Sequence, residues 1–380
     1  MKLHEPTFGE DEIAAAVEVL RSTFVTCGEK TAKLEENFCR EMRFGGTAIA
    51  CNSGSSAVLL AVAALCNPTT PNHMRPGDEV IVPALAWSTT IWPLVQHGLI
   101  PVFVDCDETF NIDPNEIERA IGPRTRAIMP VHIYGNPCDM RAIGRIADHV
   151  GNIFIMEDCC ESLGARQYGH FVGDYGLISA FSLYFSHHIT TLEGGIVYTH
   201  DGGMLPDLLR VLRSHGWMRE MENPEKHEGI DPKFTFINQG YNLRLTEVQA
   251  AIGLVQLPKL EGFIRARRQN AQHWLRIRNE HITFQKERGE SSWFGFPVIT
   301  EDVQSLKAHL NRHGIETRPI AAGNMARQPG MKLYPHRIVG DLKQTDRIWK
   351  HGISWGCHQS VTEEQRQFVT EVVEAYAPPR

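Results

Sequence analysis

Short β-rich runs alternate with helix-like segments over the first 240 residues, and this alternation limits the possible folds more than any other feature. The runs are DEVIVPA, IPVFVDCD, TRAIMPVHIYG, IFIMEDCCE, LISAFSL and GGIVYTH. Most are separated by segments whose apolar residues have helical spacing. Strands that alternate with helices favour a mostly parallel sheet covered by helices on both faces. We therefore predict an α/β fold with a large domain over residues 1–240.

The pattern changes after residue 240. Residues 246–280 have the spacing of one long helix, and the runs SSWFGFPVI and IETRPIAAG flank a second helical segment near residues 301–313. This mixture of helices and short strands predicts a smaller C-terminal α+β domain over residues 241–380.

Charge and cysteine content exclude several classes of protein. The net charge is −7, and no basic run exceeds RARR at residues 265–268, so we expect no nucleic-acid surface. The nine cysteines are odd in number and scattered, which favours reduced thiols over a disulfide framework. The N-terminal segment lacks the apolar core of a signal peptide, and no apolar run is long enough to span a membrane. We predict a cytoplasmic protein.

The stretch NSGSSA, residues 52–57, stands where a strand gives way to a helix. Free N–H groups at a helix start, a glycine and two hydroxyls can cradle a phosphate. An ordinary helix cap with serine in its first turn has the same pattern, so both interpretations stay open.

Three side chains follow strands at the edge where open α/β sheets bind ligands. Asp158 and Glu161 come directly after IFIME, and Trp87 follows the run that ends in PALA. A carboxylate there can hold a protonated ring nitrogen, and an aromatic side chain can stack on a flat ring. The alternatives are a helix cap or solvent-exposed carboxylates, and a tryptophan packed under a loop.

The stretch FSLYFSHHITTLEGG, residues 181–195, has a frame that presents a catalytic lysine in many cofactor enzymes. Here it contains His187 and His188 and no lysine, and no lysine occurs between Lys33 and Lys226. A cofactor aldehyde in this domain would therefore have no lysine there to form a Schiff base. Histidine moves protons near neutral pH but cannot form that imine. A capping or surface role is the alternative for a histidine in a polar loop.

Spacing excludes the common metal sites. Asp105 and Asp107 are placed like the start of an EF-hand loop, but Phe110 stands where that loop needs glycine. No two cysteines have C-x-x-C spacing, which argues against an iron–sulfur cluster. The histidine pair lacks a third ligand at helical spacing, so we predict no zinc site.

Together these stretches resemble the sugar aminotransferase family within the aspartate-aminotransferase fold, whose members use pyridoxal 5′-phosphate (PLP) and act on nucleotide-linked 4-keto sugars. The resemblance rests on CNSGSSA, GDEVIVPALAWSTT, PVHIYGNPCDM, EDCCESLGA, the loop from FS to EGG, and GYNLRLTEVQAAIGLVQLPKL, in family order over at least residues 30–260. It implies the type I PLP fold for this chain, with residues 1–240 as the PLP-binding domain.

The resemblance also implies how the cofactor phosphate is held. Gly54, Ser55 and Ser182 would bind it, with Asn242 reaching in from the second subunit of a homodimer. The active site would therefore lie at the subunit interface.

For the cofactor ring, the resemblance implies that Trp87 stacks on it and that Asp158 pairs with the pyridinium nitrogen. Glu161 would lie near the substituents of the ring. In that family a loop lysine holds the cofactor covalently; we assign its position to His188, as the catalytic residue, and expect His187 to be structural. PLP and pyridoxamine 5′-phosphate would then be bound without a covalent link.

The loop SHHITTLEGG and the runs SHGW and GESSWFGF resemble a histidine-bearing dehydratase subgroup of the family. The resemblance implies C3 deoxygenation of a GDP-linked 4-keto-6-deoxyhexose in dideoxysugar biosynthesis, with glutamate as amino donor and ammonia released. A second histidine-bearing subgroup carries an iron–sulfur cluster and fits poorly, because no cysteine occurs between residues 161 and 356. Two alternatives stay open: a nucleotide-sugar 4-aminotransferase and a catalytically silent binding homologue. The expected substrate contacts are His215, Trp217, Arg219 and Arg318.

Overall fold

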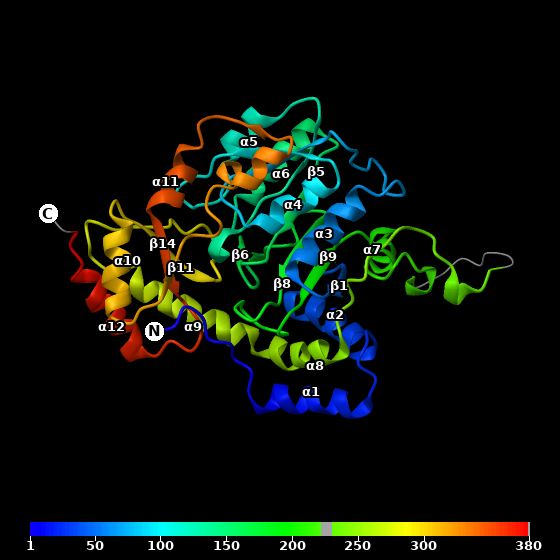
Figure 1. The fold of residues 1–380 in the computed structure, drawn as a ribbon, viewed down its shortest axis with the longest axis horizontal. Coiled ribbons are helices and arrows are strands. Elements are labelled where there is room, and N and C mark those ends of the chain that lie inside the picture. The colour runs from blue at the N-terminus through cyan, green and yellow to red at the C-terminus, as the bar shows by residue number, and fades with distance from the viewer. Residues whose placement is uncertain (222–229, 379–380) are drawn as a thin grey trace.

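A computed structural model describes residues 1–221 and 230–378, and an eight-stranded sheet forms the centre of this part of the chain (Figure 1). In order across the sheet, the strands are β1 (Thr47–Cys51), β9 (Gly195–Thr199), β8 (Ile178–Ser182), β5 (Phe154–Asp158), β4 (Thr125–Ile128), β2 (Glu79–Pro83), β3 (Ile100–Val104) and β13 (Arg337–Ile338). Strand β9 pairs antiparallel with β1 and β8, and the other neighbours pair parallel. The predicted mostly parallel sheet is confirmed.

Helices cover both faces of this sheet, as the alternation of strand residues requires. On β1, Ile49 packs on one face with helices α3 (Gly54–Leu65), α4 (Ser88–Gln96) and α7 (Leu205–Arg213). Its neighbours Ala48 and Ala50 pack on the other face with α2 (Glu29–Met42) and α8 (Glu247–Gln256). Helices α5 (Pro114–Ala120) and α6 (Met140–Val150) cover that second face over β2, β3 and β4. Successive side chains of a strand point to opposite faces, so both layers are built from the same runs.

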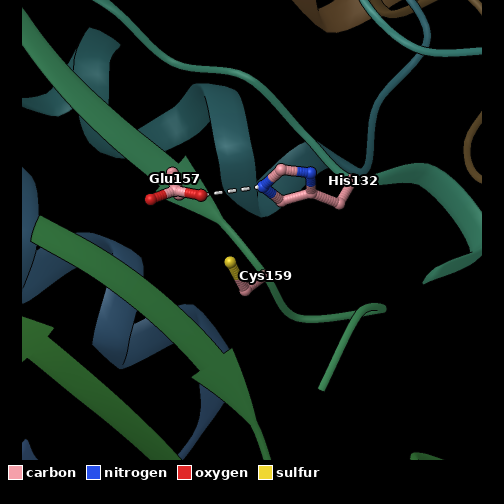
Figure 2. Close-up of side chains that lie close together, drawn as sticks. All are labelled: His132, Glu157 and Cys159. Atoms are coloured by element: carbon pink, nitrogen blue, oxygen red, sulfur yellow. Dashed lines mark hydrogen bonds and ion pairs between the residues drawn. The ribbon is translucent and has the colours of Figure 1, made fainter. Parts of the chain in front are cut away.

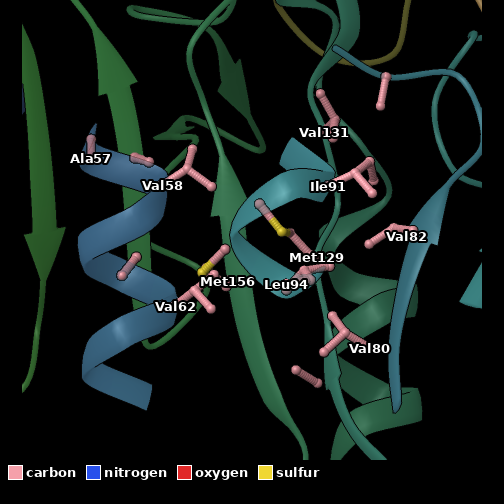
Figure 3. Packing of buried hydrophobic residues seen from close by; sticks show 14 of the residues in the cluster. Ala57, Val58, Val62, Val80, Val82, Ile91, Leu94, Met129, Val131 and Met156 are labelled. Atoms are coloured by element: carbon pink, nitrogen blue, oxygen red, sulfur yellow. The ribbon is translucent and has the colours of Figure 1, made fainter. Parts of the chain in front are cut away.

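The largest hydrophobic cluster lies between the sheet and helices α3 and α4 (Figure 3). Val58 and Val62 of α3 and Leu94 of α4 point toward Val80 and Met156 on the strands, and all five are buried. Burying each such side chain contributes roughly 1.5–3 kcal/mol. This packing fixes α3 and α4 relative to the strand ends, which is where the candidate site lies.

A second, antiparallel sheet forms the C-terminal part of the molecule. Its order is β10 (Thr283–Phe284), β11 (Gly295–Ile299), β14 (Gly352–Gly356) and β12 (Thr317–Arg318). Helices α9 (Leu260–Trp274), α10 (Val303–Arg312) and α12 (Glu363–Glu374) share its core. At the centre of that core, the rings of Trp274 and Trp355 lie 5.4 Å and 5.0 Å from the ring of Phe296. The predicted smaller α+β unit is present.

The prediction of one helix over residues 246–280 is wrong. Helix α8 ends at Gln256, a 3₁₀ turn spans Leu257–Lys259, and α9 begins at Leu260. Pro258 lacks the N–H group that a continuous helix needs, so the hydrogen-bond ladder is interrupted there.

Two segments cross the predicted division at residue 240. Helix α8 packs on α2 and on the N-terminal helix α1 (Glu10–Ser22), and β13 extends the large sheet beside β3. The division into domains of residues 1–240 and 241–380 therefore stays a prediction.

The remaining elements are the hairpin β6 (Arg166–Gln167) and β7 (His170–Phe171), helix α11 (Lys343–His351), and 3₁₀ turns Ile133–Gly135, Met218–Glu220, Pro232–Phe234, Met325–Arg327 and Pro329–Leu333. No helix in the described ranges is both long enough and apolar enough to cross a membrane.

Candidate active site

The start of α3 forms a cradle for an anion, at the carboxyl end of β1. The Ser53 hydroxyl caps the helix by accepting a hydrogen bond from the Ser56 N–H at 3.1 Å. Within the described residues, the N–H groups of Gly54 and Ser55 make no hydrogen bond, and the Ser55 side chain is exposed. Unpartnered N–H groups at a helix start bind phosphate. Both interpretations of this stretch therefore hold: Ser53 caps the helix, and the same turn offers free N–H groups to an anion.

Ser182 closes this cradle from the end of β8. A Cβ added to Gly54 would lie 2.7 Å from the Ser182 Cβ, so glycine is required for this approach. The structure thus brings together the three residues that we predicted to hold a phosphate on one chain, Gly54, Ser55 and Ser182. These residues fit the phosphate end of PLP, since the cradle has backbone donors, a hydroxyl and no side chain in the way.

Asp158 ends β5 at the same edge and is buried, with 4% of its surface exposed. Its Oδ2 accepts a hydrogen bond from the Thr90 hydroxyl at 2.7 Å, and its Oδ1 accepts one from the Cys160 N–H at 3.1 Å. Each carboxylate oxygen can accept another hydrogen bond. A buried carboxylate held in this way fits a protonated ring nitrogen.

Trp87 is the N-cap residue of α4, and Thr90 stands in the first turn of that helix. Because Thr90 contacts Asp158, the backbone of Trp87 lies one helical turn from a residue that holds the carboxylate. The ring is 55% exposed, so its face is available for stacking. The sequence did not single out Thr90, although its position one turn after Trp87 could have suggested it.

Glu161 lies beside Arg318 of β12, which comes from the C-terminal sheet. Its Oε2 accepts a hydrogen bond from the Tyr134 N–H at 2.9 Å, and its Oε1 is 4.0 Å from a guanidinium nitrogen of Arg318. Burial raises the pKa of Glu161, although Arg318 opposes that rise. The site therefore lies between the two sheets, and Arg318 is its contribution from the C-terminal one.

The two loop histidines point to different surroundings. His187 keeps part of its surface exposed, and its Nδ1 lies 2.6 Å from the Cys160 carbonyl oxygen, two residues from Asp158. Since a carbonyl can only accept, Nδ1 carries the proton and Nε2 is left as the basic nitrogen. Burial lowers the pKa of His187 to about 3, so the ring is neutral at neutral pH.

His188 has no exposed surface, and its Nε2 donates to the Ser292 carbonyl oxygen at 3.1 Å. Its Nδ1 has no hydrogen-bond partner, and burial lowers its pKa well below the usual value, with the Arg267 charge adding to this. A side chain without exposed surface cannot touch a ligand that enters from solvent. The structure thus does not bring our predicted catalytic histidine to the site; it brings the neighbouring one, which we expected to be structural.

The other predicted substrate residues form a separate group. Arg219 stacks on the Trp217 ring with 3.7 Å between its guanidinium carbon and the ring centroid, and the His215 ring lies 4.8 Å from the same tryptophan. Asn242 is exposed and belongs to the strand segment that bridges to Ser214. In this single chain, no contact joins these described residues to Asp158 or Arg318.

A buried cluster of His132, Glu157 and Cys159 lies beneath the site and has the composition of a metal site (Figure 2). Two of its three side chains, His132 and Glu157, already use their ligand atoms. His132 Nδ1 accepts from the Cys138 N–H and its Nε2 lies 3.1 Å from Glu157 Oε2. The Glu157 carboxylate also accepts three backbone N–H groups, from residues 173, 175 and 176. These bonds tie the end of β5 to its surroundings and occupy the imidazole and the carboxylate of the cluster.

Comparison with known proteins identifies the family of this chain. A model of the DegT/DnrJ/EryC1/StrS aminotransferase family matches residues 6–374. The GDP-4-keto-6-deoxy-D-mannose 3-dehydratase of Yersinia pseudotuberculosis is 42% identical over 379 residues, covering 96% of this chain and 95% of that protein.

Solved structures give the same result. A GDP-4-keto-6-deoxymannose-3-dehydratase with a trapped PLP-glutamate geminal diamine matches with a TM-score of 0.93 and 35% identity, over 98% of this chain and 99% of that one. A variant of such a dehydratase, in which an adjacent serine and histidine are replaced by asparagine and lysine, matches with a TM-score of 0.92 and 35% identity, over 97% and 100% of the two chains. The predicted fold class is confirmed.

Proposed function

Since the chain belongs to the DegT/DnrJ/EryC1/StrS aminotransferase family, we propose that it is a PLP-dependent lyase that removes the C3 hydroxyl of GDP-4-keto-6-deoxy-D-mannose. Glutamate is the amino donor: it leaves as 2-oxoglutarate and ammonia, and its two electrons replace the C3–O bond of the sugar by a C–H bond. The observation that carries this function is a phosphate cradle and a buried Asp158 at one edge of the sheet, in a segment that contains no lysine between Lys33 and Lys226. A transaminase would use a lysine there to hand over the amine.

The residues that would hold PLP are those of the cradle and the strand ends. Gly54, Ser55 and Ser182 bind the phosphate, Trp87 stacks on the ring, and Asp158 pairs with the ring nitrogen. When bound, PLP supplies an electron sink for the bonds next to the reacting amine. Asp158 supports this by keeping a proton on the ring nitrogen, and Thr90 and the Cys160 N–H hold the carboxylate in place for that task.

We propose that His187, rather than His188, moves the protons. The Cys160 carbonyl fixes the tautomer in which Nε2 carries the lone pair, and the partly exposed ring can meet a ligand at the carboxyl ends of the strands. In the solved variant described above, the position changed to lysine is a histidine that follows a serine. In this loop the histidine that follows a serine is His187, after Ser186. His188 then supports the loop from below.

A homodimer would complete the site. Trp87, Ser55 and Asn242 are exposed in one chain, which fits a cofactor pocket closed by a second copy. Asn242 of one subunit would reach the cofactor phosphate of the other. The stacked group of His215, Trp217 and Arg219 lies on the segment next to Asn242, so it would meet the nucleotide sugar across the same interface.

We also infer that the enzyme works in the cytoplasm. All nine cysteines are free thiols, and burial raises the pKa of most of them, which suits a reducing compartment.

Product analysis tests the proposal. The purified protein would be incubated with PLP, glutamate and GDP-4-keto-6-deoxy-D-mannose, while ammonia and the mass of the sugar are followed. We expect one ammonia for each sugar that loses its C3 oxygen, and weaker turnover of the CDP- and dTDP-linked sugars. A 4-amino sugar with its C3 hydroxyl intact would show that the protein is an aminotransferase instead.

A further inference from the structure

A groove lies between the end of α2, the β6–β7 hairpin and the start of α9, and it has no role in the function derived so far. It encloses about 800 Å³, whereas pockets that hold a whole small molecule usually measure about 300–1,000 Å³. None of the described residues that we assign to the cofactor or to the substrates lines it. The groove therefore has room for a ligand of its own.

Positive charge dominates the walls of the groove, although the net charge of the chain is −7. Its arginines come from three separate segments: Arg40, Arg43, Arg166, Arg265 and Arg268. The last two belong to the run RARR, the longest basic run of the sequence. The groove also contains three glutamates: Glu41, Glu261 and Glu290.

The glutamates compensate only part of this charge. Each pairs with one arginine, at N–O distances of 3.9 Å for Arg40, 3.4 Å for Arg265 and 2.9 Å for Arg268. Arg43 and Arg166 form no ion pair with any residue that the structure describes. Two guanidinium groups are thus available to an anion, and arginine matches the geometry of phosphate oxygens.

Arg166 is already held in position for such a contact. Its N–H donates to the Glu290 carbonyl oxygen at 2.9 Å, and the Glu290 N–H donates to the Arg166 carbonyl oxygen at 2.7 Å. Its guanidinium carbon lies 3.9 Å from the centroid of the Phe171 ring. A guanidinium stacked on a ring keeps the N–H donors in its plane free. Because the side chain is ordered before the ligand arrives, binding costs less conformational entropy.

The groove also offers apolar surface. Pro258 is exposed and Phe171 is half-buried, and both lie above the buried side chains of Leu260 and Ile264. A Cβ added to Gly164 would lie 2.8 Å from Ile264 Cγ1, so the loop that follows Glu161 packs directly on α9. Inorganic phosphate gains nothing from apolar surface, whereas a base or a sugar ring can cover it.

Larger anions fit this groove less well. Nucleic acid or an anionic membrane would bring many negative charges to a chain of net charge −7, with two uncompensated arginines to balance them. A nucleoside diphosphate carries its few charges in one group and has a ring system beside it. Its chemistry matches both halves of the groove.

We propose that this groove is a second nucleotide site. Arg43 and Arg166 bind the diphosphate of a nucleoside diphosphate or nucleotide sugar, and Phe171 and Pro258 contact its nucleoside. The site is separate from the one in which the reaction takes place, so the inference goes beyond the proposed function and does not depend on it.

Calorimetry with GDP on the PLP-loaded protein tests the proposal. We expect two GDP molecules per subunit in the wild type, one at the active site and one in the groove. Arg43→Gln and Arg166→Gln should each weaken one of the two about tenfold or more, in line with the loss of a hydrogen bond to a charged group, and leave the other within about twofold. Arg312→Gln, at an exposed position of α10, is the control and should keep both sites.

Pyrophosphate and melting curves complete the test. Pyrophosphate should bind the groove more weakly than GDP, because it lacks the nucleoside. Melting curves show whether the variants fold; Arg43 is exposed, so Arg43→Gln still tests the groove if Arg166→Gln does not fold.

Three results would overturn the proposal. They are a single GDP per subunit that both variants bind like the wild type, a second GDP that neither variant weakens, and pyrophosphate that binds the groove as tightly as GDP. Failure of the proposed function gives a different result. In that case the wild type would make no 3-deoxy sugar, while one GDP per subunit would still depend on Arg43 and Arg166.

Discussion

Two regions meet at the candidate site, and they satisfy their polar groups to different degrees. One region, the floor, consists of Thr90, His132, Glu157, Asp158 and Cys160 at the carboxyl ends of the strands. The other, the seam, consists of His188, Arg267, Ser292 and His358, between the two sheets. In the floor every buried carboxylate and ring nitrogen has a partner. In the seam each of the four residues has one buried polar atom without a partner.

The difference follows from what each region has to do. The floor would have to hold the Asp158 carboxylate in a fixed position under the cofactor. Hydrogen bonds from the Cys160 N–H and the Thr90 hydroxyl hold it rigidly. In the seam, Arg267 is buried and donates to the carbonyl oxygens of Trp293 and Phe294, with no carboxylate partner among the described residues. Burial lowers the pKa values of His187, His188 and His358, and the charge of Arg267 lowers them further. We therefore expect the seam to be more sensitive to pH than the floor.

Substitution of the loop histidines should give the largest effect on the reaction rate. His187 is bonded to Cys160 of the floor, and His188 is bonded to Ser292 of the seam. His187→Asn should lower the rate of C3 deoxygenation about 10²–10⁴-fold, the usual contribution of a general acid or base. His188→Asn, the matched change one residue later, should lower the rate less than about tenfold and act mainly on thermal stability. Steady-state kinetics and melting curves of both variants check this. Equal rate losses, or a larger loss in His188→Asn, would return the proton-transfer role to His188.

Removing the charge from Glu157 should destabilise the floor next most strongly. The Glu157 carboxylate accepts four hydrogen bonds, three of them from backbone N–H groups. In Glu157→Gln one oxygen becomes an NH₂ group, which cannot accept a hydrogen bond from these N–H groups. Removing one partner of a buried pair costs about 3–5 kcal/mol. The free energy of unfolding in urea measures this cost. Glu290→Gln is the control, since the Glu290 side chain is exposed and its pair with Arg268 contributes less than about 1 kcal/mol. A loss below that of the control would mean that the floor does not depend on this carboxylate.

The seam should respond to acid, and His358 provides the measurable case. Burial lowers its pKa from 6.5 in the unfolded chain to about 4. Between these values the unfolded state binds more protons, so stability falls as pH falls from about 6.5 toward 4. At pH 5 the loss from this group is about 2 kcal/mol.

The variant His358→Asn should therefore lose about 2 kcal/mol less than the wild type on going from pH 7 to pH 5. Urea unfolding at the two pH values measures this difference, and the exposed His281→Asn is the control. Parallel pH profiles of wild type and His358→Asn would show that the seam is not the pH-sensitive region.

These regions also show what the sequence can and cannot predict. The mostly parallel sheet and the cradle at Gly54 follow from strand and helix periods, which are local. The choice between His187 and His188 is different, because a polar loop has no period and a shift of one residue reverses which way a side chain points. Thr90 acts through a partner that lies 68 residues away. Such a contact depends on how distant segments pack, and no local pattern encodes it.

Removing one hydroxyl from each region should give the smallest changes in stability, and it compares the two regions directly. In the floor, Thr90 donates to Asp158 at 2.7 Å, so Thr90→Val removes a hydrogen bond to a charged group and should cost about 1.5 kcal/mol. In the seam, the Ser292 hydroxyl is buried without a partner, so Ser292→Ala removes a group that is already unsatisfied. Its free energy of unfolding should stay within about 0.5 kcal/mol of the wild type, or rise.

Urea unfolding of the two variants measures both changes, and the rate of deoxygenation gives a second readout. Thr90→Val should also slow the reaction, because Asp158 is then held by one donor fewer, whereas Ser292→Ala should leave the rate unchanged. If Ser292→Ala cost as much as Thr90→Val, the seam hydroxyl would have a partner in solution, such as a buried water. The contrast between the two regions would then rest on the three remaining unpartnered atoms of the seam, in His188, Arg267 and His358.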